Sequence, residues 1–280
     1  MRAWLFEKVP RGRVAVLRAV LYTFIFVDVL LTTSWIARHA ALPGELYHPL
    51  LLGRWLPLPV PGAGYVRTVE IALLLCAALA ATGRAPRAAG AAVALLYLQW
   101  MLIGMSYGKV DHDRFAFLVA LAVLPTVGPA RWGDHTADES SGWAIRSVQV
   151  AVVLTYLLAS YAKLRYGGIA WLDGSTLMRA VIRRGTYLAE PLKDMPGVLR
   201  VGQYLIMLFE LASPLLLVRG RVGRSFLVAA LLFHLTTYAT ITIIFLPHVM
   251  CLLSFVPLER LRPPRLVGRV LSPAPVAPAR

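Results

Sequence analysis

The sequence predicts an all-α polytopic membrane protein, a helical bundle of about eight transmembrane helices with interfacial amphipathic segments between them. The 280 residues are 58% hydrophobic and only 15% charged, and the mean hydropathy is +0.66. Apolar runs of about twenty residues, rich in Leu and Ala, recur along the chain. Because lipid offers backbone groups no hydrogen-bond partners, we expect these runs to cross a bilayer as helices.

The first half of the chain predicts four spans and one broken segment. Residues 38–65 contain five prolines among leucines, so this segment is expected to lie along the membrane surface. Residues 128–142 are the most polar stretch and predict an aqueous loop. The four spans are expected at residues 14–36, 66–82, 88–107 and 112–127.

The second half predicts four more spans. The fifth begins near Val148, and residues 175–196, where basic and apolar side chains alternate, predict an interfacial amphipathic helix. The apolar run at 225–257 is too long for one untilted helix, so we divide it into two. Spans six, seven and eight are therefore expected at residues 198–218, 225–240 and 242–256.

This pattern defines three regions: a cytoplasmic N-terminal segment at 1–13, a transmembrane domain at 14–257, and a disordered tail rich in Arg and Pro at 258–280. The first apolar run is of full length and lacks a small-x-small cleavage site, so it predicts an uncleaved span. An even number of spans places both termini on one side. More than half of the 29 Lys and Arg residues fall on that side, which favours cytoplasmic termini in a multi-pass protein of the cell membrane, such as a bacterial inner membrane.

The net charge of +15 is explained by topology and by anionic lipid headgroups, because the arginine clusters occupy the gaps between apolar runs. Membrane lipids are therefore expected partners, and nucleic acid is not. Cys76 and Cys251 both lie inside apolar runs and predict two buried thiols, not a disulfide.

A polar stripe marks the fifth span. Gln149, Tyr156, Ser160 and Lys163 follow one another at steps of seven, four and three, so they share one helical face. An ammonium group costs up to about 3 kcal/mol at the bilayer centre and less near a helix end, where it can snorkel to the interface. Lys163 is therefore either a functional group facing protein or an interfacial anchor.

Other ionisable residues fall in or beside the apolar runs. Asp111 and His112 open the fourth span and are expected at the same depth as Lys163, whereas Asp28, Glu210 and His234 are deeper. Each has a structural alternative. His112 fits a wet loop, Asp28 a pairing with Arg18 or another helix, Glu210 a neutral hydrogen-bonded carboxyl, and His234 a packed cluster with Thr237 and Tyr238.

Motifs for soluble cofactors and metals are missing from the sequence. The six histidines lack the HExxH and H-x3-H spacings, and there is no phosphate-binding loop, dinucleotide fingerprint or GxSxG. This leaves a lipid-soluble reactant that reaches its site from between the helices.

The stretch YAKLRYGGIAWLDGSTL, with neighbouring motifs, resembles the HTTM (horizontally transferred transmembrane) domain family, which is related to the membrane domain of vitamin K-dependent gamma-carboxylase. The resemblance covers residues 14–257. The matching positions are Lys163, Leu164, Trp171, Gly174 and Ser175, then Arg18 and Asp28, the Asp111-His112 pair, and the segments FELASPLLL and LFHLTTYATITIIF.

The resemblance implies a site and a cofactor. In the carboxylase, the lysine that matches Lys163 is regarded as the base that starts oxygenation of vitamin K hydroquinone, and the histidine that matches His112 as a carbanion stabiliser. We therefore expect a quinol cofactor, no metal, and a carboxylase-like enzyme without the luminal substrate domain. The expected catalytic residues are Lys163 and His112, and the expected supporting network is Asp28, Asp111, Tyr156, Ser160, Glu210 and His234.

Two other functions remain open. The polar stripe could dock another chain, as in a non-catalytic membrane scaffold or a partner in peptide-toxin maturation, and a peptide or protein substrate is compatible with either hypothesis. A transporter is favoured less, because the sequence shows neither internal repeats nor broken helices.

Overall fold

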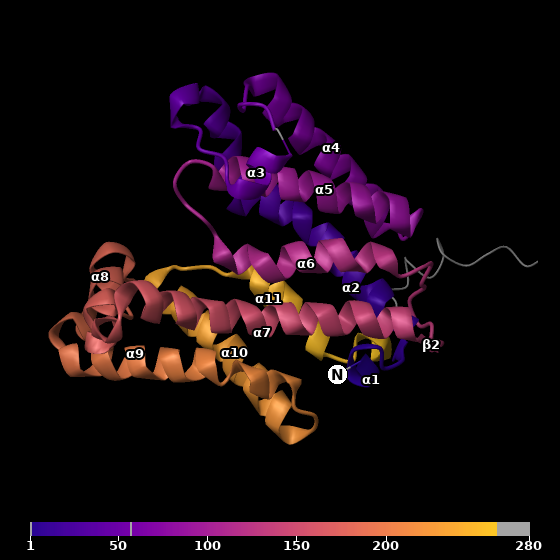
Figure 1. The fold of residues 1–280 in the computed structure, drawn as a ribbon. Helices are drawn as coiled ribbons and strands as arrows, with labels where there is room; N and C mark the ends of the chain where they lie inside the picture. Colours follow the sequence, from indigo (N-terminus) through magenta and orange to yellow (C-terminus); the bar gives the residue numbers. More distant parts are fainter. Residues whose placement is uncertain (1, 57, 262–280) are drawn as a thin grey trace, which may run out of the picture.

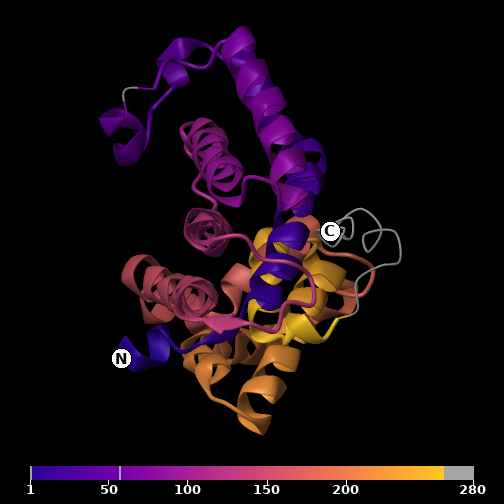
Figure 2. The ribbon, with the colours of Figure 1, turned by 90° about the vertical axis from the view of Figure 1, so that its right-hand side faces the viewer.

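The computed structural model describes residues 2–56 and 58–261, which are almost entirely helical. The one sheet in this part of the chain is a two-stranded antiparallel ladder, in which β1 (Val9–Pro10) pairs with β2 (Ala137–Asp138). In both views α4 and α10 lie on opposite sides of the bundle, with α2 and α7 between them (Figures 1 and 2). The prediction of an all-α fold is confirmed.

Within residues 2–56 and 58–261, five helices are long and apolar enough to cross a membrane, which indicates a membrane protein. The first is α2 (Arg11–Val27), which continues through a π-helical turn at Asp28–Thr32. The others are α4 (Ala63–Ala81), α5 (Pro86–Met105), α7 (Glu139–Gly167) and α10 (Arg221–Ile241).

The count of about eight spans is not confirmed, because three of the expected spans form shorter helices. These are α6 (Phe115–Val123), α9 (Pro196–Leu211) and α11 (Leu246–Leu252). Pro125 and Pro214 each stand in a 3-10 turn that follows an α-helix. A proline lacks the N–H that would continue an α-helix, which explains where α6 and α9 stop.

The long apolar run at 225–257 forms two helices, as the sequence predicts. Helix α10 ends at Ile241, and Thr242 adopts a left-handed conformation with φ of 53°. Three non-helical residues follow before α11 begins. This break opens the groove described below.

Short helices occupy the segments expected at the interface. They include α3 (Leu51–Trp55), in the proline-rich segment, and α8 (Ser175–Arg184), which buries Val181 and exposes its two final arginines. Helix α8 lies beside the end of α7 that carries Lys163, whereas α1 (Arg2–Leu5) and the β ladder lie at the other end (Figure 1).

The core lies between α2, α5, α6 and α7, and its largest fully buried side chains include Tyr22, Tyr97, Trp100 and Phe117. Arg18 is also buried here. It donates to the carbonyls of Leu124 and Gly128, at 2.5 and 3.0 Å, and so neutralises the carboxyl end of α6.

The first residues of the tail that was expected to be disordered, 258–261, are ordered in the structure. Leu258–Arg260 forms a 3-10 turn in which Leu258 is buried. Arg13 donates two hydrogen bonds of 2.7 Å to Glu259. The rest of the expected tail, residues 262–280, lies outside the described residues.

Candidate functional site

A cavity of about 180 Å³ lies between α7, α9, α10, α11 and the turn that precedes α6. We call it the lysine pocket. It is lined by the polar residues His112, Asp113, Thr155, Tyr156, Lys163, Glu210, His234 and His248, together with Ala159, Phe233 and Phe245.

Lys163 forms an ion pair with Glu210, which α9 presents to it. Ser160, one turn earlier on α7, donates to the other oxygen of the same carboxylate at 2.9 Å. The amine also lies 5.3 Å from the centre of the Trp171 ring, a cation–π distance. The side chains of Lys163 and Glu210 are 23% and 7% exposed, so the pair is largely shielded from solvent and Lys163 is not a freely snorkelling anchor.

Tyr156 and His234 form a second polar pair, one turn before Ser160 on α7. The Tyr156 hydroxyl and His234 Nε2 are 2.7 Å apart. The ring of His248, from α11, packs edge-on against Tyr156 with 4.5 Å between centroids. His248 is 1% exposed, and within the described residues neither of its ring nitrogens has a hydrogen-bond partner.

His112 reaches the same pocket from a 3-10 turn, His112–Arg114, that precedes α6. Its ring lies 6.5 Å from that of Phe245, and no hydrogen bond joins it to Lys163 in the described part of the chain. The structure therefore places both predicted catalytic residues in one cavity without direct contact.

Asp28 and Asp111 lie outside this pocket, and Asp28 is linked to it through Arg114, whose Nε lies 3.7 Å from the carboxylate of Asp113, a lining residue. Asp28 is fully buried, accepts a hydrogen bond of 2.8 Å from Tyr97 and pairs with Arg114, not with Arg18. Asp111 pairs with Lys109 at 2.7 Å. Arg114 is the charge partner of Asp28 because the turn before α6 faces the π-helical turn that follows α2. The two residues are far apart in the sequence, so this contact could not be predicted from it.

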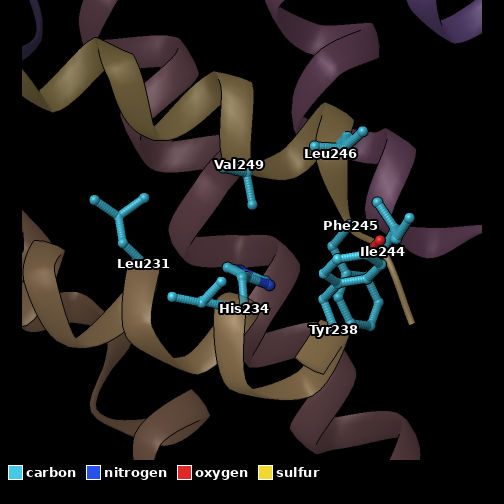
Figure 3. A pocket seen from close by; sticks show the side chains of 8 residues that line it. Leu231, His234, Tyr238, Ile244, Phe245, Leu246 and Val249 are labelled. Atoms are coloured by element: carbon cyan, nitrogen blue, oxygen red, sulfur yellow. The ribbon is translucent and has the colours of Figure 1, made fainter. Parts of the chain in front are cut away.

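Two further cavities adjoin the lysine pocket. An apolar groove of about 400 Å³ runs between α10 and α11 and shares His234 and Phe245 with it. Figure 3 shows His234 on α10 facing this groove, with Val249 and Leu246 across from it on α11 and Phe245 beside Tyr238. A polar cavity of about 420 Å³, lined by Lys109, Asp111 and Arg114 among others, shares Asp113 with the lysine pocket.

Sequence reasoning missed His248, Arg114 and Tyr97. His248 carried the same signal as His234, a histidine within an apolar run (LPHVMC). Tyr97 and Arg114 could not be identified, because a tyrosine in a span and an arginine at a span end are ordinary interface residues.

No family model, curated protein or solved structure matches the chain. Among the described residues, no group of three or more His, Cys, Asp or Glu side chains is placed to hold a metal ion. The side chains of the site are therefore the basis for assigning its chemistry.

Proposed function

We propose that the chain is an integral membrane enzyme that binds a quinol-like lipid in the lysine pocket and removes a proton from its hydroxyl group. The observation that carries this proposal is the Lys163–Glu210 ion pair, shielded from solvent in a pocket that shares residues with an apolar groove. Perturbed or paired ionisable groups inside membrane helices are functional candidates.

The groove between α10 and α11 supports a lipid ligand. Its lining is almost wholly apolar, with Leu231, Leu235, Ile244, Leu246 and Val249 around His234. A hydrophobic tail lying in this groove would place its head group at His234 and Phe245, which also line the lysine pocket.

The ion pair supplies the proton acceptor. In this proposal the Glu210 carboxylate, which contacts Lys163 and Ser160, takes the proton from the quinol hydroxyl. Lys163 then lies beside a quinolate and a neutral carboxyl, and its charge stabilises the new anion. This step moves one proton from oxygen to oxygen. Dioxygen, the co-substrate in this proposal, then takes two electrons from the quinolate, which becomes the quinone, and with two protons forms hydrogen peroxide.

His112 and Asp113 offer that proton a way out. Both line the lysine pocket, and Asp113 also lines the polar cavity beside Lys109 and Asp111. His112 in this proposal is a proton carrier between Glu210 and that cavity.

The proposal also includes eight membrane spans and membership of the HTTM family. The non-helical residues 242–245 and the ten helical residues 246–255, which are about 15 Å long, form the eighth span in this proposal. With α6 and α9 lengthened by their 3-10 turns, eight spans would place both termini in the cytoplasm. The resemblance of Lys163 and its neighbours to the HTTM family supports the same assignment.

The test is quinol-dependent oxygen uptake by the full chain in lipid nanodiscs. Glu210→Gln keeps the shape and polarity of the carboxyl, and we expect it to lower turnover by about 10²–10⁴-fold, as Lys163→Met should. Lys193→Met is the matched control, because Lys193 also pairs with a glutamate, Glu190 at 2.6 Å, but at the surface. Full turnover in both pocket variants would overturn the proposal, and a stable small protein partner with no quinol binding would favour a scaffold.

A further inference from the structure

His248 is a buried polar side chain whose hydrogen-bonding groups are unused. It is 1% exposed, and neither Nδ1 nor Nε2 has a partner within the described residues. His234 Nδ1 is also buried and has no hydrogen-bond partner within the described residues. Buried polar atoms are nearly always hydrogen-bonded, so two such histidines lining one cavity call for a ligand.

His248 and His234 both line the lysine pocket. His248 packs against Tyr156, whose hydroxyl is already engaged by His234. Ser160, which holds Glu210, is four residues further along α7. Four residues of an α-helix rise about 6 Å, so Tyr156 and Ser160 lie about one helical turn apart along α7.

The volume of the pocket also points to one ring. A dry cavity of about 150 Å³ accommodates benzene, and the lysine pocket measures about 180 Å³. A head group of two fused rings would need the surrounding side chains to move, whereas a single ring would not. The tail of such a ligand has the adjoining groove of about 400 Å³.

We infer that the lysine pocket takes the single-ring head of a quinol-like lipid, with one oxygen at the Lys163–Glu210 pair and the opposite oxygen hydrogen-bonded to His248. The inference rests on the proposed function and adds the ring size and the second anchor. A neutral imidazole has one donor and one acceptor nitrogen, so His248 can pair with a hydroxyl in either role.

The experiment measures binding rather than turnover. Trimethylhydroquinone (one ring) and menadiol (two fused rings) are titrated calorimetrically, under argon, into the full chain in nanodiscs. We expect the one-ring probe to bind at least tenfold more tightly. His248→Leu should weaken its binding by tenfold or more, and His248→Gln, which keeps a donor and an acceptor, should stay within about threefold of the unmodified chain.

The matched control is His39→Phe. His39 is likewise packed among aromatic rings, those of Trp35 and Tyr107, but it lies outside the pocket. His248→Phe, which preserves the ring packed on Tyr156, replaces His248→Leu if the latter does not fold.

Equal affinity for both probes, or a one-ring affinity that His248→Leu leaves unchanged, would overturn the inference. If turnover then still depends on Lys163 and Glu210, the proposed function stands without it. If the unmodified chain binds neither probe, both fall.

Discussion

Ser160 and Lys163, three residues apart on α7, contact the two oxygens of one carboxylate, that of Glu210 on α9. Ser160 donates to Oε2 at 2.9 Å, and Lys163 pairs with Oε1. The two side chains share a helical face, so a single rigid element fixes both partners of the carboxylate. Glu210 is thereby held in one orientation toward the pocket, as a proton acceptor requires.

Replacing Ser160 tests this orientation. Ser160→Ala removes one hydrogen bond to a buried carboxylate, which we expect to lower the free energy of unfolding by about 1–3 kcal/mol and quinol turnover by roughly tenfold. Ser225→Ala, at an exposed position on α10, is the control for both measurements. Unchanged turnover in Ser160→Ala would show that the pair needs no third partner.

The pair Asp28–Arg114 is expected to be structural. Removing one member of a buried ion pair leaves the other uncompensated, so Asp28→Asn or Arg114→Met should lower the free energy of unfolding by about 3–5 kcal/mol. The double variant should lose less than the sum of the two. Urea unfolding in detergent provides the comparison.

Asp28→Asn also tests whether the two polar groups are separate. Asp28 contacts Tyr97, Thr32 and Arg114, so it is joined to the lysine pocket indirectly, through the pairing of Arg114 with Asp113 at 3.7 Å. We therefore expect the affinity of Asp28→Asn for trimethylhydroquinone to match that of the unmodified chain. A loss of tenfold or more would join the two groups into the single network that the sequence predicts.

Gly142 is fixed by a close backbone approach near the start of α7. A Cβ at this position would lie 1.9 Å from the carbonyl oxygen of Glu7. Gly142→Ala must therefore displace the N-terminal segment, and we expect a large fall in the melting temperature. Gly64→Ala is the matched control, because nothing lies within 4 Å of a Cβ there and alanine favours the helix. Equal melting temperatures for the two variants would contradict the close approach.

Asp138 makes the fold sensitive to acid at the cytoplasmic end in the proposed topology. Burial raises its pKa, but hydrogen bonds from Ser141 and Arg11 outweigh this and lower the pKa from 3.8 to about 2. A carboxyl whose folded pKa is depressed stabilises the fold above its unfolded pKa and loses that contribution as pH falls through the folded value. Melting temperatures of the unmodified chain and Asp138→Asn should therefore differ at pH 6 and converge between pH 4 and pH 2. A constant difference would argue against this carboxyl.

The helical spacing of polar residues in the sequence predicted which side chains of α7 contribute to the site. The steps from Tyr156 to Ser160 and Lys163 place these side chains on one face of α7, and the structure finds them there. The resemblance placed Glu210 and His234 in the same expected network. Which residue of α7 each one contacts could not be predicted, because these contacts arise from helix packing that no local pattern encodes.

The number of spans depended on prolines as much as on hydropathy. Apolar content alone treats 112–127 and 198–218 as full spans, yet Pro125 and Pro214 end the α-helices early. The position of Asp28 outside the lysine pocket could not be predicted for a related reason. The π-helical turn at Asp28–Thr32 aims its carboxylate at the turn before α6, and such a turn has no signature in the spacing of residues.

The central claim is that the Lys163–Glu210 pair removes the proton of a quinol bound in the lysine pocket. The most direct measurement is the ultraviolet difference spectrum of trimethylhydroquinone mixed anaerobically with the full chain at neutral pH, with and without Glu210→Gln. We expect a quinolate band with the unmodified chain that is lost in Glu210→Gln and kept in Lys193→Met. A band of equal size in the unmodified chain and Glu210→Gln, or no band from the unmodified chain, would contradict it.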